Sequence, residues 1–467
     1  MTYSLISPRV LFRSFPVLLV AFGCAYYNGL YNANRLADQA RKAEREGRGG
    51  EARTLWSRVV VKTDSVLARY PTSSYRDDAL LLRGTALFEI GACDVATGSL
   101  IEVADSSPDP ELRSIALRTL SRCHLLLDNP DLAAVVLSPL ADDSSAAGRS
   151  DALWIRGQAY LDLGENERAL ADLEATFEPG ATFDRARALI RLRRGEAART
   201  QLLGMPSRPY NENEWLLVLD QLGADYVDIA SDLTDSILAR GHLTEGQRAR
   251  LQLSDGLRWS VRDSIRRAAM RYGQVRESAS DSLEAQMAAF YLVKDRLLTS
   301  RSLADIPVLL DSLRTAGQSN PSVGAAAGPF LIVLDRFVSG STVGFDWDLR
   351  TFLIAEEFRD SVRAFSLASQ MFQSIADSVP HSVIAPKALL AAAQIDPVDA
   401  VSLRERVMSD YPESAYTLAF FGHDSDRFAA VEDSLLSIIS SRLRYRIGDG
   451  RDDEVDHDGD ADMPRVD

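Results

Sequence analysis

The stretch WIRGQAYLDLGENERALADL, from Trp154 to Leu173, decides the fold. Its five key positions follow one another at steps of three, four, five and four: Gly157, Tyr160, Gly164, Ala169 and Leu173. Steps of three and four place side chains on one face of a helix, and the glycine in the middle permits a tight turn. The pattern therefore predicts two short antiparallel helices. Small residues at Gly157 and Ala169 let the helices approach closely, and Tyr160 and Leu173 fill the space beside them.

Two earlier stretches repeat these steps. The first set is Gly84, Leu87, Gly91, Ala96 and Leu100, and the second is Ser121, His124, Asp128, Ala133 and Leu137. The three sets begin at residues 84, 121 and 157 and so recur after 37 and 36 residues, close to the roughly 34-residue period of tetratricopeptide repeats. The set at 154–169 resembles that family most closely, and a weaker copy has its turn at 195–198.

The resemblance implies an all-α fold, namely a solenoid of antiparallel helix hairpins in a tetratricopeptide-like superhelix. An ordinary helical bundle that has small residues at these places by chance is the alternative.

A second motif marks three helix ends. An aromatic or apolar residue, Pro, any residue and Ser occur in this order at residues 70–73, 379–382 and 411–414. Proline stops one helix and the serine can cap the next. Ser74, three residues before Asp77, also has the spacing of a capping box. The motif resembles the helix-ending signature of the BamD-like branch of tetratricopeptide lipoproteins, and it implies two more hairpins over residues 348–416.

The composition limits the class of protein and of partner. The chain has 467 residues, of which 46% are hydrophobic and 25% charged, so it is long enough for two or three domains or one extended repeat array. The formal net charge of −15 argues against nucleic acid as a partner, because binding phosphates requires a surplus of Lys and Arg.

The N-terminus has the order of a lipoprotein signal. Arg9 and Arg13 precede an apolar run at residues 15–22, which is too short to span a bilayer, and a small residue then stands before Cys24. This order resembles the bacterial lipobox and implies that Cys24 is lipidated. Because Ala25 rather than Asp follows, the resemblance also implies sorting to the outer membrane, on its periplasmic face. A signal peptide cut elsewhere, or an uncleaved anchor, is the alternative.

The other two cysteines, Cys93 and Cys123, lie 30 residues apart in neighbouring predicted helices. Free cysteine is among the most buried residue types, so we expect two small buried thiols. A disulfide is the alternative, and it requires the two Cα atoms to lie close together.

The patterns divide the chain into six parts. They are a lipoprotein signal peptide at 1–23, a membrane-proximal segment and first helix at 24–50, N-terminal tetratricopeptide-like repeats at 51–204, a divergent helical region at 205–340, C-terminal tetratricopeptide-like hairpins at 341–447 and an acidic tail at 448–467. In the divergent region we expect irregular hairpins, or a separate helical domain, with a loop of small residues at 317–328. We expect the tail to be disordered, with a calcium-binding loop as the alternative.

The residue patterns that carry catalysis or hold metals were not found. None of the five histidines lies one helical turn from another His or Cys, so we expect no zinc or haem site. The sequence has no glycine-rich phosphate loop with its Lys and no Gly-x-Ser-x-Gly elbow. We therefore expect no catalytic residue, no metal and no cofactor. Carboxylates are too numerous to exclude a glycosidase pair by counting, so an α-helical toroid hydrolase stays as a distant alternative.

The predicted first helices define a candidate binding surface. If the small first positions of the three sets face their partner helices, another stripe of each first helix lines the hollow of the superhelix, where stacked repeats bind. The groove residues are Phe88, Arg118, Arg122, Trp154 and Gln158, with Leu81 and Leu161 on the same stripes. Arg118 and Arg122 lie one turn apart, so both can bind one carboxylate or an acidic peptide. Alternatively, the two arginines pair with Asp78 and Asp151 on flanking helices.

These expectations describe a binding protein rather than an enzyme. We expect a lipid-anchored periplasmic scaffold or adaptor that binds other envelope proteins or peptides through a helical-repeat groove and contacts the membrane through its N-terminal lipid. A component of outer-membrane protein assembly is the alternative that the BamD-like resemblance implies.

Overall fold

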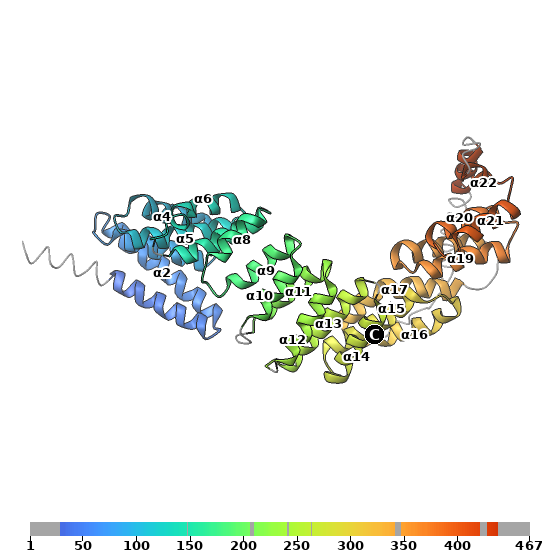
Figure 1. Cartoon of the computed structure of the whole chain (residues 1–467), viewed down its shortest axis with the longest axis horizontal. Helices are drawn as coiled ribbons and strands as arrows, with labels where there is room; N and C mark the ends of the chain where they lie inside the picture. The colour runs from blue at the N-terminus through green and yellow to red at the C-terminus, as the bar shows by residue number, and fades with distance from the viewer. Residues whose placement is uncertain are drawn as a thin grey trace, which may run out of the picture. The chain divides into compact units, whose positions relative to one another are not determined.

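A computed structural model of the chain describes residues 29–437 except 147, 206–209, 241, 263, 341–346 and 421–426. All regular secondary structure in these residues is helical (Figure 1). The first helix occupies residues 29–45, and most helices pack against the next one along the chain as hairpins. The predicted all-α solenoid of antiparallel hairpins is confirmed. The predicted signal peptide, Cys24 and the acidic tail lie outside the described residues.

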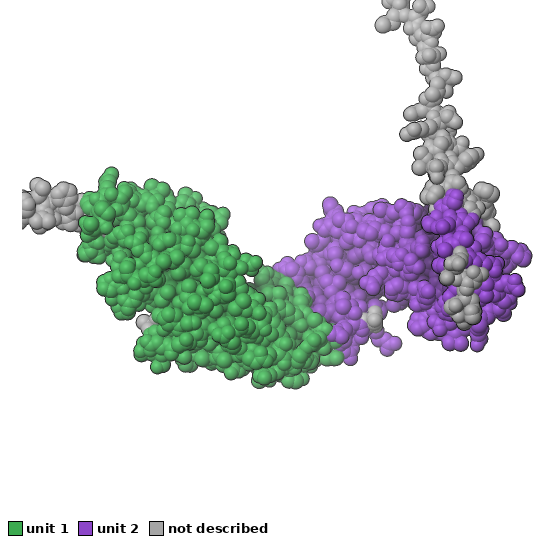
Figure 2. Space-filling view, turned by 90° about the horizontal axis from the view of Figure 1, so that it is seen from above, with its two compact units in different colours: residues 1–242 green, residues 243–467 purple. Residues whose placement is uncertain are grey.

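The chain forms two compact units, residues 1–242 and 243–467 (Figure 2). After the first helix, unit 1 contains α2 (Gly49–Arg69), α3 (Arg76–Glu89), α4 (Cys93–Ser106), α5 (Pro110–Leu126), α6 (Pro130–Ala141), α7 (Arg149–Asp162), α8 (Asn166–Glu174), α9 (Ala181–Arg191), α10 (Gly195–Leu203), α11 (Glu212–Asp225) and α12 (Val227–Ala239). Unit 2 contains α13 (Glu245–Val261), α14 (Ile265–Ser278), α15 (Leu283–Thr299), α16 (Ile306–Gln318), α17 (Pro321–Gly340), α18 (Trp347–Glu357), α19 (Phe365–Ser378), α20 (Ala385–Ile395), α21 (Ala400–Asp410) and α22 (Ala415–Phe420). A 3-10 turn (Leu303–Asp305) precedes α16, and a π-helical turn (Phe358–Val362) follows α18.

The turn inside each predicted hairpin has one geometry. The third position of each sequence set has a positive φ, which is 83° at Gly91, 57° at Asp128 and 76° at Gly164. The next residue donates its N–H, at 2.8–2.9 Å, to the carbonyl of the second position in the set: Ala92 to Leu87, Asn129 to His124, and Glu165 to Tyr160. Such bonds end a helix through a left-handed residue, as in a Schellman motif. The predicted role of Gly or Asp in the turn is confirmed.

Two more hairpins of unit 1 share this turn. They have the same sequence steps, at Ala40, Ala43, Gly47, Ala52 and Trp56, and at Ala186, Leu189, Arg193, Ala198 and Leu202. The third positions again have positive φ, 72° at Gly47 and 60° at Arg193. From the sequence we predicted the second hairpin only as a weaker copy of the repeat, and we did not predict the first as a repeat. The second hairpin is hard to recognise from the sequence because Arg193 stands at its turn, and a residue with a Cβ rarely adopts a left-handed conformation.

The small first positions are required by the packing between helices. A Cβ atom on Gly84 would lie 2.6 Å from Leu100 Cδ2, and one on Gly157 would lie 2.6 Å from Leu173 Cγ. Unit 2 has the same contact, since a Cβ on Gly256 would lie 2.5 Å from Tyr272 Cε1. Each pair is 16 residues apart, the full length of the step pattern. The hairpin α13–α14 is therefore another copy of the repeat inside the region 205–340.

Replacing Gly157 with Leu should overpack the α7–α8 hairpin. Leu173, which faces it, is fully buried and has no free space to move into, so we expect a loss of about 1–3 kcal/mol in the free energy of unfolding. Gly98 in α4 is exposed and a Cβ there meets nothing within 4 Å, so Gly98→Leu is the matched control. Urea unfolding followed by circular dichroism measures both. Equal stability of the two variants would show that the register is wrong.

The proline motif builds the same corner at all three places. Each serine Oγ accepts the N–H of the second residue after it: Tyr75 to Ser73 at 3.3 Å, Ile384 to Ser382 at 3.1 Å, and Tyr416 to Ser414 at 3.3 Å. The predicted capping is present at Ser414, which directly precedes α22 and accepts the N–H of the second residue of this helix. It is wrong for Ser73 and Ser382, because the N-cap residues of α3 and α20 are Tyr75 and Ile384. The capping box predicted for Ser74 is wrong, because α3 begins only at Arg76 and its N-cap residue Tyr75 makes no side-chain cap bond.

The two cysteines of unit 1 form a disulfide, which corrects the expectation of two free thiols. Cys93 is the first residue of α4 and Cys123 lies in the last turns of α5. These helices pack directly against each other, and the two Cα atoms are 5.1 Å apart, within the range that a disulfide requires. The disulfide therefore joins the hairpin α3–α4 to the hairpin α5–α6.

The small residues at 317–328 are helical, so the predicted loop there is wrong. α16 ends at Gln318 and α17 begins at Pro321. A Cβ on Gly324 would lie 2.9 Å from the Gly317 carbonyl oxygen, so the small residues allow α16 and α17 to approach each other closely and do not form a loop.

By length and composition, one helix in the described part of the chain could cross a membrane, Pro321–Ser339, and 22% of this stretch is buried. Core helices pass the same test, and α17 packs along α16.

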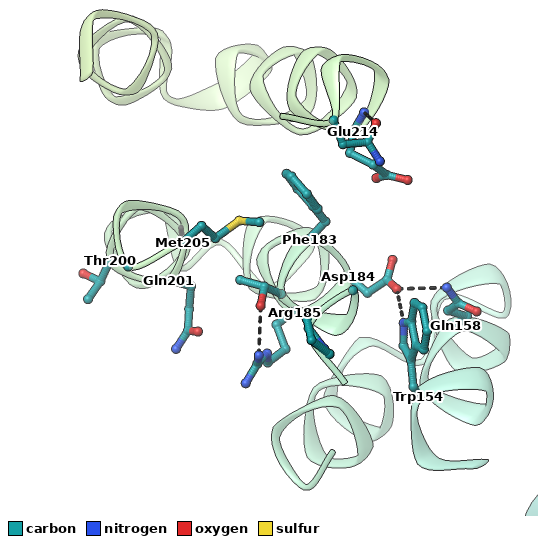
Figure 3. Close-up of a pocket in the computed structure, with 14 residues that line it drawn as sticks. Trp154, Gln158, Phe183, Asp184, Arg185, Thr200, Gln201, Met205 and Glu214 are labelled. Carbon is teal, nitrogen blue, oxygen red and sulfur yellow. Dashed lines mark hydrogen bonds between the residues drawn. The ribbon is translucent and has the colours of Figure 1, made fainter. Parts of the chain in front are cut away.

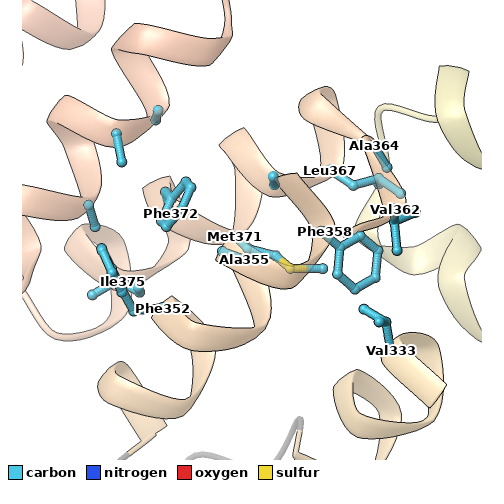
Figure 4. Packing of buried hydrophobic residues seen from close by; sticks show 14 of the residues in the cluster. Val333, Phe352, Ala355, Phe358, Val362, Ala364, Leu367, Met371, Phe372 and Ile375 are labelled. Carbon is cyan, nitrogen blue, oxygen red and sulfur yellow. The ribbon is translucent and has the colours of Figure 1, made fainter. Parts of the chain in front are cut away.

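Unit 2 has a large apolar core that extends from α15 to α20 and beyond. Phe358 and Phe372 are fully buried in it, and Figure 4 shows Met371, Leu367 and Val362 around Phe358. The two hairpins predicted for residues 348–416 are present as α18–α19 and α20–α21.

The turn between α18 and α19 resembles the turns of unit 1 with one residue more. Arg363 has a positive φ of 63°, like the third positions of the sequence sets. Ala364 then donates its N–H to the carbonyl of Phe358, six residues back instead of five, at 2.9 Å. The π-helical turn before it supplies the extra residue. This insertion hides the hairpin from a search by spacing.

Candidate binding surface

Both arginines of the predicted groove bind the same carboxylate. Arg118 Nη1 and Arg122 Nη2, on α5, donate to the two oxygens of Asp151 at 2.8 and 2.7 Å. Asp151 lies in the first turn of α7, where a negative charge is favourable. The structure therefore contains the alternative that we predicted, in which the arginines pair with a carboxylate on a flanking helix. The partner of both arginines is Asp151 rather than Asp78.

Trp154 and Gln158 are joined by a second carboxylate. Trp154 Nε1 and Gln158 Nε2, on α7, donate to Oδ2 of Asp184 at 2.7 and 3.0 Å. Asp184 is in the first turn of α9 and is nearly fully buried. Its other oxygen accepts from Arg187 at 2.5 Å, and Arg187 also pairs with Glu214 on α11. Polar bonds thus connect α5, α7, α9 and α11, which are the first helices of successive hairpins.

Two glycines leave the space that the large side chains of this surface occupy. Gly148 precedes α7 with a φ of 79°, and a Cβ on it would lie 3.0 Å from Nε of Arg118. Gly180 precedes α9, and a Cβ on it would lie 2.6 Å from Cζ2 of Trp154. In each case the absent side chain lets a side chain of the preceding first helix lie across the start of the next one.

The ion pairs along this surface are not one to one. Two guanidinium groups share one carboxylate at α5–α7, so that end keeps a net positive charge. At α9–α11 one guanidinium group, Arg187, serves the two carboxylates of Asp184 and Glu214, and the second guanidinium group there, that of Arg185, balances the charge. Arg122 is 39% exposed and Glu214 35% exposed, so both charges reach solvent.

Two further carboxyl groups on α3 and α7 have raised pKa values. Burial raises the pKa of Glu89, and Glu44 adds to this, although Arg122 and Arg41 act in the opposite direction. Burial also raises the pKa of Asp162, and the attraction of Arg191 does not offset it. The hydrogen-bonded partners of the arginines on this surface are Asp151, Asp184 and Glu214.

The structure separates the predicted groove residues into two pairs and one remaining residue. Arg118 and Arg122 meet at Asp151, and Trp154 and Gln158 meet at Asp184. Phe88, on α3, is half-buried and packs against the core of the neighbouring hairpins. Leu81 and Leu161 are buried in the core, at 8% and 4% exposure, so their predicted place on the groove stripe is wrong. They lie on the side of the helix that faces other helices.

A cavity of about 660 Å³ lies beside Trp154 (Figure 3). Its wall is built from α7, the start of α9, the end of α10 and the start of α11. The apolar part consists of Trp154, Pro179, Phe183 and Met205. The polar part includes Gln158, Asp184, Arg185, Gln201, Asn211 and Glu214, together with Thr182 and Thr200. This size and mixture are typical of ligand pockets.

From the sequence we did not predict Asp184, Arg187 or Glu214 as part of this surface, and we expected Asp151 there only as an alternative partner of the arginines. A signal was present in their spacing. The bonded pairs are 33 residues apart for Arg118 and Asp151, 30 for Trp154 and Asp184, and 27 for Arg187 and Glu214. Each partner thus lies about one repeat later, in the first turn of the next first helix.

In the part of the chain that the structure describes, no group of three or more His, Cys, Asp and Glu side chains is placed to hold a metal ion. His124, the bulky second position of its set, is half-buried, and burial lowers its pKa.

No family model matches the sequence, and no curated protein matches it. Among solved structures, a tetratricopeptide repeat protein from Parabacteroides merdae is 13% identical with a TM-score of 0.36, over 55% of this chain and 96% of that one. The C-terminal part of a TPR repeat-containing protein from Cytophaga hutchinsonii is 12% identical with a TM-score of 0.40, over 56% and 98%. A Rap protein complexed with competence and sporulation factor is 10% identical with a TM-score of 0.29, over 82% and 99%.

At these sequence identities and TM-scores, the similarities to solved structures add nothing to what the helix contacts show about the class of protein. The hairpin turns and the small-residue contacts define the class of protein: an α-helical repeat protein with tetratricopeptide-like hairpins. Proteins of this architecture present extended surfaces for other proteins.

Proposed function

We propose that this protein is a lipid-anchored periplasmic scaffold that binds other envelope proteins or peptides through the first helices of unit 1. The observation that supports binding is the polar surface that runs from α5 to α11 and carries Arg122, Trp154 and Glu214 beside a cavity. Here aromatic and charged groups are held in fixed positions and stay partly exposed, as recognition requires.

The charge arrangement suggests the kind of segment that fits. A partner segment with acidic residues toward α5 would complement the net positive charge of that end. Electrostatic complementarity of this kind fixes the orientation of a bound segment and excludes segments of the wrong charge. A role in outer-membrane protein assembly is a narrower form of this proposal, and the identity of the partner decides it.

The binding proposal is tested with the variant Arg118→Ala, Arg122→Ala, Trp154→Ala. A photo-crosslinking residue at Gln158 first identifies the partner in intact cells, and recovery of that partner is then compared between variants. We expect recovery to fall at least about tenfold, because these side chains include the aromatic and Arg types that dominate interface energies. A matched control carries Arg53→Ala, Arg58→Ala and Leu132→Ala, on exposed positions of α2 and α6.

The circular-dichroism melt of each variant separates binding from folding. Lost recovery with a melt near that of the wild type supports the groove. A large fall in melting temperature with the partner still bound would make these residues structural, since Asp151 is only 17% exposed and loses both arginines in the variant.

The anchor is tested at Cys24. The order of basic residues, apolar run, small residue and cysteine motivates this part of the proposal. Two or three acyl chains hold a protein at a membrane where a single chain does not. A fatty-acid probe fed to cells should label the wild type and not Cys24→Ala, and the variant should leave the membrane fraction. Equal labelling of both proteins would contradict lipidation at this residue.

A further inference from the structure

The cavity beside Trp154 contains a guanidinium group without an acidic partner. Among the described residues, Arg185 forms no ion pair, and its guanidinium donates to Oγ1 of Thr182 at 3.1 Å. Its Nε is buried and has no hydrogen-bond acceptor within the described part of the chain. A ligand cannot reach this buried nitrogen, so the terminal nitrogens of the Arg185 guanidinium are the donors that remain for a group in the cavity.

The carboxylates of the same cavity are already committed. Asp184 accepts from Trp154, Gln158 and Arg187, and Glu214 pairs with Arg187. Figure 3 draws Glu214 and Arg185 on opposite sides of Phe183. The positive charge of Arg185 is therefore left for a group that enters from outside.

The rest of the wall is suited to an apolar group. Trp154, Pro179 and Met205 line the cavity together with Phe183, which is held edge-on against Trp215 with ring centroids 5.3 Å apart. The indole of Trp154 is itself fixed by its bond to Asp184 and by Gly180. A rigid aromatic wall can take an aromatic or branched side chain at little cost in conformational freedom.

We propose that this cavity binds an apolar side chain that adjoins a carboxylate, and that Arg185 binds the carboxylate. The inference rests on the proposed function and specifies its ligand at one place, namely an acidic and apolar pair of groups in the bound segment. Arg185 offers a planar set of donors that matches a carboxylate in two-point contact. A charge-assisted bond of this kind contributes about 1.5–3 kcal/mol, so loss of the carboxylate should weaken binding at least about tenfold.

Two probes that differ in one group test the proposal. N-acetylphenylalanine has the aromatic ring and a free carboxylate, and N-acetylphenylalaninamide has the same ring without the charge. Each probe is titrated by saturation-transfer NMR into the whole chain held in detergent. We expect the wild type to bind the acid at least about tenfold more tightly than the amide. Arg185→Gln should reduce this preference to less than about twofold, and Arg194→Gln, on an exposed arginine outside the cavity, should leave it unchanged.

Three results would overturn the proposal. These are equal binding of acid and amide to the wild type, no binding of either probe, and a preference for the acid that survives Arg185→Gln in a variant with an unchanged circular-dichroism melt. If Arg185→Gln does not fold, Arg185→Lys, which keeps the charge but not the two-point geometry, takes its place, with an intermediate preference expected. Partner recovery with the Arg118, Arg122 and Trp154 variant does not involve Arg185. A failed probe experiment with intact groove dependence therefore rejects the cavity ligand and not the scaffold function.

Discussion

Replacing Arg156 with Ala should remove about 3–5 kcal/mol from the free energy of unfolding of unit 1, because it leaves a buried carboxylate without its counter-charge. Arg156 is 8% exposed and binds Asp172 through two bonds, from Nε at 2.6 Å and from Nη2 at 2.9 Å. A third bond, from Nη1, reaches Asp142 at 2.7 Å. Burial disfavours the charged form, but the bonds to Asp172 and Asp142 outweigh it and raise the pKa of Arg156.

Urea unfolding followed by circular dichroism checks this expectation. Arg199→Ala is the control, because the ion pairs of Arg199 with Glu196 and Asp232 are exposed and contribute less than about 1 kcal/mol. A loss for Arg156→Ala no larger than that of the control would contradict the assignment of a buried pair.

Unit 2 contains the same kind of buried ion pair with the arginine and the aspartate exchanged between the two helices, and this suggests a stricter test. Arg156 and Asp172 directly precede Gly157 and Leu173, and Asp255 and Arg271 directly precede Gly256 and Tyr272 in the same way. There the carboxylate is on the first helix, and Arg271 Nε binds Asp255 at 2.7 Å. The double variant Arg156→Asp, Asp172→Arg should therefore regain most of the stability that either single change loses. Asp142 is 67% exposed, so its repulsion with the new aspartate is weak.

Replacing Trp56 with Ala should cost about 3–5 kcal/mol and should act mainly on the first hairpin of unit 1. Trp56 is 1% exposed, and its Nε1 donates to Glu44 at 2.5 Å. It faces a helix whose buried residues are Leu30 and four alanines: Ala33, Ala37, Ala40 and Ala43. Alanine side chains are too small to fill the space that the indole leaves, so the helix at 29–45 loses its principal contact.

Hydrogen exchange locates this effect. In a repeat array each hairpin contacts mainly its neighbours, so amides of residues 29–69 should lose protection before those of α7 and α8. Val61→Ala on the same helix is the control, because Val61 is 67% exposed, and it should change stability by less than about 0.5 kcal/mol. Uniform loss of protection across unit 1 would mean that the whole unit unfolds together.

The sequence alone determined the repeat wherever the residues at its key positions were small and regularly spaced. Gly157 and Leu173 could be assigned to one contact from their spacing, because a helix has a fixed number of residues per turn and only glycine or a similarly small residue permits that approach. The same steps were present at Ala186 and at Gly256, but Arg193 and Tyr272 replaced the expected residue types, so the first was predicted only as a weaker copy and the second was not recognised. In α18–α19 one inserted residue changed the step itself.

The tertiary structure decided the partners of side chains that spacing leaves open. Sequence could place Arg118, Arg122, Trp154 and Gln158 on neighbouring first helices, but the rotation of each helix about its own axis decides which carboxylate they meet, and packing sets that rotation. For the same reason Leu81 and Leu161 belong to the core although they share stripes with groove residues. The pairing of Cys93 with Cys123 also depends on a distance between helices, which no local pattern contains. Helix formation is local and readable from the chain, whereas the choice of contacts between helices depends on the whole stack.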